Sequence, residues 1–341
     1  MVKWLDRLQQ RSRFAGFIIA VVYKYLDDQG GYLAALLTYY AFVSLFPLLL
    51  LLTTTLGVLL WNRPQWRAQI VDSAISQFPL IGDQLSRPES LSGGTTAVVV
   101  GILGALYGGL GVGQALQNAM NTLWSVPRFD RRDPIRSRVH SLLLLVILGS
   151  ALVATTLLTG LGRNWASLGV VGTAGVVMAS VLLNTAVCAV AFRVTTVRPL
   201  TWAQVMPGAV LAAVVWQGLQ WFGASYVSHV VASASVTNSV FAIVLGLLAF
   251  LYLVSVALML CAEINVVRVD RLHPRALLTP FTDNVDLTVA DRKAYAGQAE
   301  AQRAKSFQQV DVSFGAAQPE GEVRMDNGEA ALKPVQSLDN T

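Results

Sequence analysis

The most constraining feature of the sequence is the length of its uncharged runs. Five runs contain no Asp, Glu, Lys or Arg: 29–62, 90–127, 139–162, 164–192 and 199–262. A helix that crosses the hydrocarbon core of a bilayer needs about 20 predominantly apolar residues. Only 13% of the residues are charged, against about 25% in an ordinary soluble domain. The sequence therefore predicts an all-α, polytopic integral membrane protein.

These runs predict six transmembrane helices. The last run is too long for one span and divides at the polar stretch 228–238. We expect spans at about 32–60, 96–116, 141–161, 170–192, 207–227 and 239–262. They make residues 32–275 one transmembrane domain with an outer loop at 61–95.

The distribution of Lys and Arg predicts the orientation. Before the polar tail, 15 of these residues flank one set of span ends and 4 flank the other. Since cytoplasmic loops carry the excess of positive charge, we expect both termini in the cytoplasm. The formal net charge of +5 then reflects topology, and we expect no nucleic-acid partner.

Both ends of the chain and the outer loop have patterns of their own. Residues 1–31 are predicted to form a cytoplasmic amphipathic helix that ends at Gly30–Gly31 and lies in the membrane interface. Its apolar face would consist of Trp4, Leu8, Phe14, Ile18, Val21 and Tyr25. The outer loop places Trp66, Ile70, Ala74 and Phe78 four residues apart, which favours a helix on the outer surface. Residues 276–341 are predicted to be a cytoplasmic tail, mostly disordered from Thr282 because few large apolar residues remain there.

The first span contains a polar group of residues around a proline. Pro47 leaves one backbone carbonyl of the helix without its usual donor. Ser44 and Tyr40 lie on roughly the same face and are candidate partners for that carbonyl, next to Tyr39. The group is either a packed kink or part of a substrate path.

The second span is rich in glycine and ends in amides. Small-xxx-small spacing, which lets helices pack closely, occurs twice, at Gly104–Gly108 and Gly109–Gly113. Four amide side chains follow at three- and four-residue separations, and a tryptophan comes next: Gln114, Gln117, Asn118, Asn121 and Trp124. They form either a hydrated inner end of the span or a substrate contact.

The last span carries a carboxylate at its inner end. Glu263 follows a long apolar run and precedes Asn265. A charge in this position is costly unless it is paired or hydrated, so we expect Arg268 or an arginine of loop 128–138 to pair with it. Glu263 is either a structural anchor or a site of proton or cation coupling.

The residue inventory argues against an enzyme. The two cysteines lie in apolar runs and the three histidines are dispersed, so we expect no metal and no cofactor. No catalytic cluster of acidic residues and histidines is evident either.

Four segments resemble the YihY/BrkB family of bacterial inner-membrane proteins. They are AALLTYYAFVSLFPLLL at 34–50, MNTLW at 120–124, MPGAVLAAVVWQGLQWFGASY at 206–226 and LMLCAEINVV at 258–267. The resemblance covers about residues 15–270 and implies a six-helix protein of the bacterial cytoplasmic membrane. It names no activity, since the former label ribonuclease BN is regarded as mistaken.

Two functions fit these observations. Polar residues within otherwise apolar spans, including Asn184, favour a transporter or lipid-handling protein whose partners are membrane lipids and a lipid or amphipathic substrate. The alternative is a non-transporting membrane scaffold or assembly factor, in which the glycines and the tail bind partners. The sequence leaves the substrate and the oligomeric state open.

Overall fold

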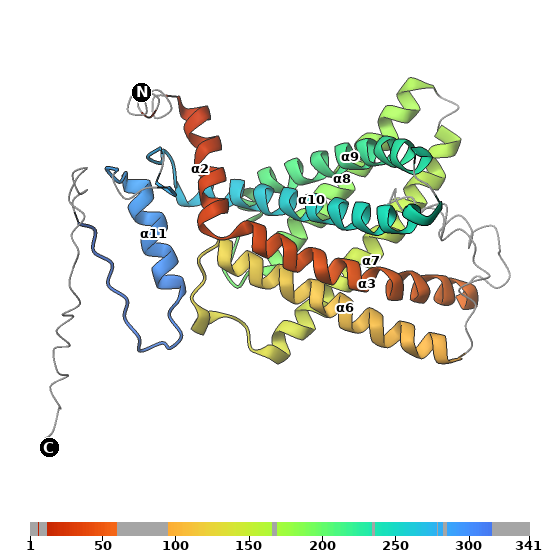
Figure 1. Cartoon of the computed structure of the whole chain (residues 1–341), viewed down its shortest axis with the longest axis horizontal. Helices are drawn as coiled ribbons and strands as arrows, with labels where there is room; N and C mark the ends of the chain where they lie inside the picture. Colours follow the sequence, from red (N-terminus) through yellow and green to blue (C-terminus); the bar gives the residue numbers. More distant parts are fainter. Residues whose placement is uncertain are drawn as a thin grey trace, which may run out of the picture.

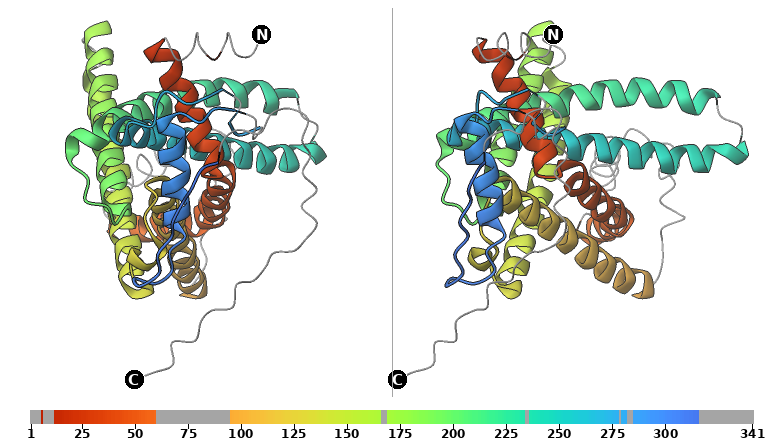
Figure 2. Two further views of the ribbon diagram at one scale, coloured as in Figure 1. Left: turned by 90° about the vertical axis from the view of Figure 1, so that its left-hand side faces the viewer. Right: turned by 60° about the vertical axis from the view of Figure 1, so that its left-hand side comes forward.

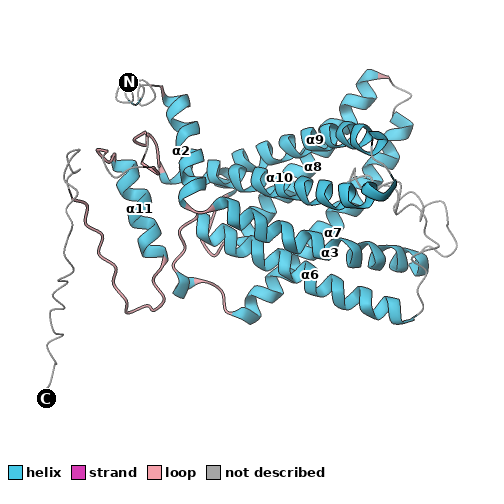
Figure 3. Cartoon of the chain, in the orientation of Figure 1, coloured by secondary structure: helices cyan, strands magenta, loops and turns pink. Residues whose placement is uncertain are grey.

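The computed structural model describes Asp6 and residues 12–59, 95–165, 169–233, 236–277, 279–281 and 285–315. The described residues form helices and no strands, which confirms the all-α class (Figure 3). The helices are α2 (Arg13–Asp27), α3 (Gly30–Leu59), α6 (Thr95–Leu123), α7 (Pro134–Trp165), α8 (Val170–Thr195), α9 (Trp202–Ser233), α10 (Val236–Asp270) and α11 (Val289–Ala301), with a short 3-10 helix at Arg128–Asp130.

Each predicted span falls on one long helix, and most of the helices extend beyond the predicted span. The break between α9 and α10 lies within the polar stretch 228–238. Over the described residues, four helices contain segments long and apolar enough to cross a membrane: Pro134–Ala151, Ala174–Thr195, Trp202–Phe222 and Val244–Asp270. Gly30–Leu45 of α3 is a shorter apolar stretch. That all six helices cross the membrane therefore stays a prediction, and the predicted outer-loop helix lies outside the described residues.

The long helices run alongside one another, and the other elements gather at one end of them. This end holds α2, α11 and the α6–α7 and α8–α9 connections (Figure 1). Away from it, the α9–α10 pair and the α3–α6 pair diverge (Figure 2). We call this the α2 end of the bundle.

Helix α2 lies across the bundle end at a steep angle to α3 (Figure 1). Ser12 caps its first turn by accepting from the backbone N–H of Ala15. The chain turns at Gln29, whose φ is 56°, so the helix ends before the predicted Gly30–Gly31. The exposed apolar stripe consists of Phe14, Ile18, Val22 and Leu26.

The predicted apolar face of this helix was partly wrong. Phe14 and Ile18 are exposed as expected, but Val21 is buried and Tyr25 packs against the core. Both faces of α2 carry apolar residues, because one face meets the bundle and the other does not. Trp4 and Leu8 lie outside the described residues.

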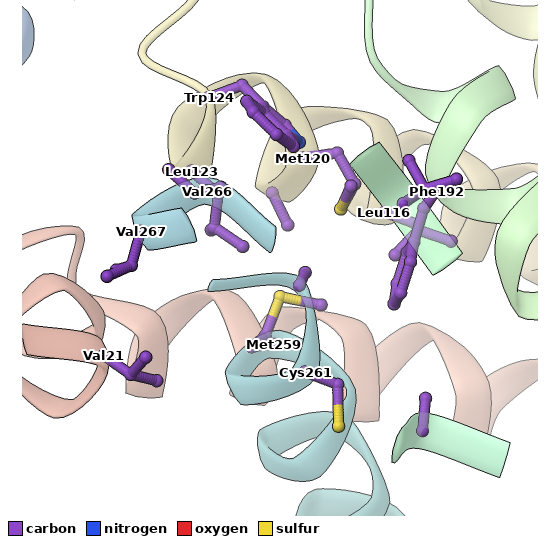
Figure 4. Close-up of a cluster of buried hydrophobic side chains, with 14 of the residues drawn as sticks. Val21, Leu116, Met120, Leu123, Trp124, Phe192, Met259, Cys261, Val266 and Val267 are labelled. Atoms are coloured by element: carbon purple, nitrogen blue, oxygen red, sulfur yellow. The ribbon is translucent and has the colours of Figure 1, made fainter. Parts of the chain in front are cut away.

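The core lies at the α2 end and joins helices α2, α3, α6, α8, α9, α10 and α11. Figure 4 shows Met120 of α6, Trp124 directly after α6, Phe192 of α8 and Met259 of α10 in this cluster, with Val21 of α2 at its edge. All five side chains are buried. The packing fixes the ends of the long helices relative to α2.

The glycines of α6 allow close approach of the helices on both sides. A Cβ added at Gly108 would lie 2.5 Å from the Cβ of Ser44, and one added at Gly104 would lie 2.8 Å from the Pro47 ring. The other pairs of this kind are Gly111 with Tyr40, Gly109 with Leu145 and Gly113 with Ser141. Glycine is thus needed where α6 meets α3 and α7.

The tail that was predicted to be mostly disordered from Thr282 contains an ordered helix within residues 285–315. This helix is α11, which begins with a capping box between Thr288 and Asp291. Ala290, Ala294 and Ala301 bury one face of this helix. Small alanines pack there without the large apolar residues that the disorder argument required. Figure 2 shows α11 beside α2.

Candidate functional site

A buried cluster of charged side chains lies where α2, α6, α10 and α11 meet. Lys24 comes from the last turn of α2 and Asp28 from its C-cap, so the two are one helical turn apart. Glu263 comes from α10, inside the segment Val244–Asp270. Lys24 is 1% exposed and Glu263 is 0% exposed. Ionisable side chains buried in a membrane protein are costly and are rare unless they are paired.

Lys24 is held by two acceptors. Its Nζ donates to Oδ2 of Asp28 and, at 3.1 Å, to the carbonyl oxygen of Leu123 at the end of α6. The other oxygen of Asp28 accepts from Nε2 of Gln298 on α11 at 3.0 Å. The ion pair of α2 is therefore tied to both α6 and α11.

Glu263 has no such support. Both of its carboxyl oxygens are buried, and no donor among the described residues reaches either of them. Its carboxyl lies within hydrogen-bonding reach of the Asp28 carboxyl and feels the charge of Lys24. The predicted partners were wrong: Arg268 donates instead to the carbonyl oxygens of Ala203 and Gln204.

The arginines of loop 128–138 also bond elsewhere. Arg132 donates to the carbonyl oxygens of Thr195 and Thr196 at 3.2 and 2.9 Å. Arg131 donates to Oδ1 of Asn118 at 2.9 Å. These contacts bind the α6–α7 connection to α6 and to the end of α8.

The electrostatics around Lys24 favour its charged form. Burial by itself lowers the pKa of Lys24, but the carboxylates of Glu263, Asp28 and Asp27 together outweigh burial. The pKa of Lys24 is therefore raised above its ordinary value of 10.5. Lys24 is a fixed positive charge at neutral pH.

A second ion-pair group adjoins the first. Arg275, which is fully buried, pairs with Asp27 of α2 at 2.9 Å and with Asp291 of α11. Its guanidinium carbon lies 5.2 Å from the ring centre of Tyr295. Burial raises the pKa of Asp27 in spite of the lowering effect of Arg275. This group attaches α11 to the bundle.

Two of the predicted polar residues of the first span pack against glycines of α6. Ser44 is buried against Gly108, and its hydroxyl donates to the carbonyl of Ala41 at 3.0 Å, not to the carbonyl that Pro47 leaves free. Tyr40 packs beside Gly111. Tyr39 is 54% exposed and contacts the Tyr40 ring edge-on.

The predicted amides of α6 divide between two faces. Asn121 is buried and its Oδ1 accepts from the backbone N–H of Val197 at 3.0 Å. Gln117 is buried against α7, where it donates to Ser141 at 2.9 Å. Gln114 and Asn118 are exposed. Four amides at helical spacing thus do not form one lining.

Two further candidates also have structural contacts. Trp124 is buried in the core, and the Arg198 guanidinium carbon lies 4.9 Å from the centre of its ring. Asn265 joins α10 to α9: its Oδ1 accepts from the N–H of Gly208 at 2.8 Å and its Nδ2 donates to Val205 at 3.1 Å. Glu263 is therefore separated in role from the other predicted residues.

Sequence reasoning missed Lys24 and Asp28 as site residues. The signal was available, since a Lys and an Asp four residues apart end an otherwise apolar helix. It also missed helix α11, although Thr288-x-x-Asp291 has capping-box spacing. The ion pair between Arg275 and Asp291 was missed as well. Over the described part of the chain, no group of three His, Cys, Asp or Glu residues could hold a metal ion.

The comparisons with known proteins agree with the resemblance found in the sequence. A family described as virulence factor BrkB matches residues 21–283. Two UPF0761 membrane proteins of Stenotrophomonas maltophilia, from strains K279a and R551-3, are each 25% identical to this chain over 285 residues. The match covers 77% of this chain and 63% of each relative, so the chain spans less than two thirds of the relatives' length. No solved structure matches.

Proposed function

Because the chain belongs to the virulence factor BrkB family of membrane proteins, we propose that it moves a lipid or another amphipathic envelope component across a bilayer. The proposal includes no enzymatic step. The observation that carries it is the buried cluster of Lys24, Asp28 and Glu263 at the α2 end of the bundle.

A protein that only packs in the membrane has no need of this cluster. A buried polar group without a hydrogen-bond partner costs about 1–3 kcal/mol, and more when it is charged. Leucine or glutamine at position 263 would avoid that cost. Ionisable residues within membrane segments mark ion or substrate pathways in many transporters, and Glu263 fits that pattern better than the role of an anchor.

The proposal places both termini in the cytoplasm, with the α2 end facing it. This orientation is supported by the basic residues in the connections at that end, since Lys and Arg concentrate on the cytoplasmic side. Helix α2 would then lie in the plane of the inner membrane surface, with Phe14, Ile18, Val22 and Leu26 in contact with lipid.

Reconstitution of the full chain tests the proposal. Liposomes of phosphatidylethanolamine and phosphatidylglycerol would carry a fluorescent phospholipid, with and without an imposed pH gradient. We expect faster movement between leaflets than in protein-free liposomes, and a loss of this gain with Glu263→Gln. The matched control is Asp133→Asn, since Asp133 is exposed and pairs only weakly with Arg136. Movement at the protein-free rate under all conditions would reject the proposal.

The scaffold is the second candidate, and the packing favours it. Tyr40, Ser44, Asn121 and Asn265 are all engaged in contacts between helices or connections. Substituting Gly104 or Gly108 would not test partner binding, because both glycines already face α3. Leu103 and Tyr107 of α6 are exposed, so polar substitution there, with removal of the tail, should abolish co-purification of a partner if the scaffold is correct.

A further inference from the structure

We propose that Asp28 and Glu263 form a binding site for one proton, which the two carboxyl groups share beside Lys24. The proposal deepens the proposed function by naming the coupling ion. It is tested without any measurement of transport, so the two can fail separately.

The two carboxyl groups of the proposed site lie close together. Glu263 lies within hydrogen-bonding reach of Asp28, while no nitrogen or hydroxyl donor of the described residues reaches Glu263. Two ionised carboxylates are acceptors only and cannot bond to each other. One proton on either group turns this repulsive contact into an O–H···O hydrogen bond, and it supplies Glu263 with its missing partner.

The charges of Lys24, Asp28 and Glu263 do not balance when all three groups are ionised. With all three groups ionised, Lys24 faces two carboxylates, and the trio has a net negative charge in a fully buried site. One bound proton makes the trio neutral, which avoids most of the penalty for burying a charge. The neutral trio is the form that suits a membrane interior.

The neighbouring charged groups do not remove this excess. Asp27 is the other acid that bears on Glu263, and its guanidinium partner Arg275 also serves Asp291. Two acids therefore share one cation in this second group as well. Tyr295 of α11 also lies beside Arg275. None of these groups supplies a further positive charge to Glu263.

The geometry favours a proton over a metal ion. Lys24 already occupies the cationic position next to Asp28, and the described residues offer no set of three metal-ligating side chains. The remaining oxygen of Asp28 is bonded to Gln298 of α11. A divalent cation would have to displace an ammonium and an amide, whereas a proton displaces nothing.

Infrared spectroscopy of the full chain in nanodiscs tests the site, because a protonated carboxylic acid has a carbonyl stretch distinct from that of a carboxylate. We expect a buried acid band in the wild type at neutral pH. Glu263→Gln should remove it, since the new amide donates to an ionised Asp28. Asp28→Asn should remove it for the reciprocal reason. Asp133→Asn, at an exposed position, should leave it unchanged.

Two results would overturn the proposal. One is the absence of a buried acid band from the wild type, which would mean that both carboxyls stay ionised. The other is a band that survives both substitutions, which would assign the proton to another acid. If the Glu263→Gln protein does not fold, Asp28→Asn alone decides between the outcomes. A band that behaves as expected in a protein without lipid movement would retain the proton site and reject the transport function.

Discussion

The contact between α3 and α6 gives a prediction whose size follows from the structure. Gly108→Ala places a Cβ 2.5 Å from the Cβ and 2.6 Å from the Cα of Ser44. Ordinary van der Waals contact begins at 3.4 Å, so the backbones must separate by about 0.8 Å. Rotation of a side chain cannot relieve this clash, since one of the atoms belongs to the backbone. Overpacking of this kind costs about 1–3 kcal/mol.

Gly149→Ala in α7 is the matched control. A Cβ at Gly149 would meet nothing within 4 Å. Both substitutions gain up to about 1 kcal/mol in helix propensity, and this gain cancels when the two variants are compared. The Gly108→Ala protein should therefore be less stable than the Gly149→Ala protein by about 1–3 kcal/mol.

Unfolding of each variant by sodium dodecyl sulfate in bicelles measures this difference. The expected order of stability is Gly149→Ala, wild type, Gly108→Ala, although the last two converge if overpacking costs only about 1 kcal/mol. Equal stability of the two variants, or a more stable Gly108→Ala protein, would refute the close approach of α6 and α3 at this glycine.

Three further predictions concern the charged groups and Asn265. Lys24→Met should lower the free energy of unfolding by about 3–5 kcal/mol, because it leaves buried carboxylates without their cation. Since the pKa of folded Lys24 lies above 10.5, its contribution to the free energy of unfolding is complete below pH 10.5 and is lost as the pH rises through the pKa of the folded state. Unfolding curves measured below and above that pKa should show this loss in the wild type and not in the variant. Asp291→Asn removes the ion pair with Arg275 and weakens the capping box, so hydrogen exchange in 289–301 should accelerate while exchange in α6 stays unchanged. Asn265→Ala loses two buried hydrogen bonds and should cost about 1–3 kcal/mol without changing lipid movement per folded molecule; an unaltered unfolding curve would contradict the role of Asn265 in joining α9 to α10.

Uncharged runs predict where long helices lie, because the hydrocarbon core excludes charge whatever the tertiary contacts are. They do not predict where such helices end. Helix α7 begins at Pro134, seven residues before the predicted span, and includes Arg136 and Arg138. A helix can continue through the charged interface, so the end of an apolar run is not the end of the helix.

Roles of single polar residues could not be predicted in the same way. Asn121 and Asn265 are polar residues of the kind expected along a substrate path. Each instead accepts a hydrogen bond from a backbone N–H that is distant in sequence. The sequence predicts a partner for Glu263 on its own helix or on the nearest basic loop, whereas the cation whose charge bears on it, Lys24, comes from the other end of the chain. These pairings depend on tertiary packing that no local pattern contains.

The error for α11 has a different cause. Average composition argued for disorder after Thr282, although the capping box and the alanines at 290 and 294 are local signals for a short packed helix. Asp291 of this helix also pairs with the buried Arg275. Averages over a long tail hide an ordered segment of 13 residues.

We propose that the buried acid Glu263 couples movement of an amphipathic substrate to protonation. The most direct test measures translocation of labelled phospholipid by the reconstituted wild type and by Glu263→Gln over a range of pH. The wild-type rate should exceed that of protein-free liposomes and change with pH, while the Glu263→Gln rate should be lower and independent of pH. Equal rates for the two proteins at every pH would contradict the claim.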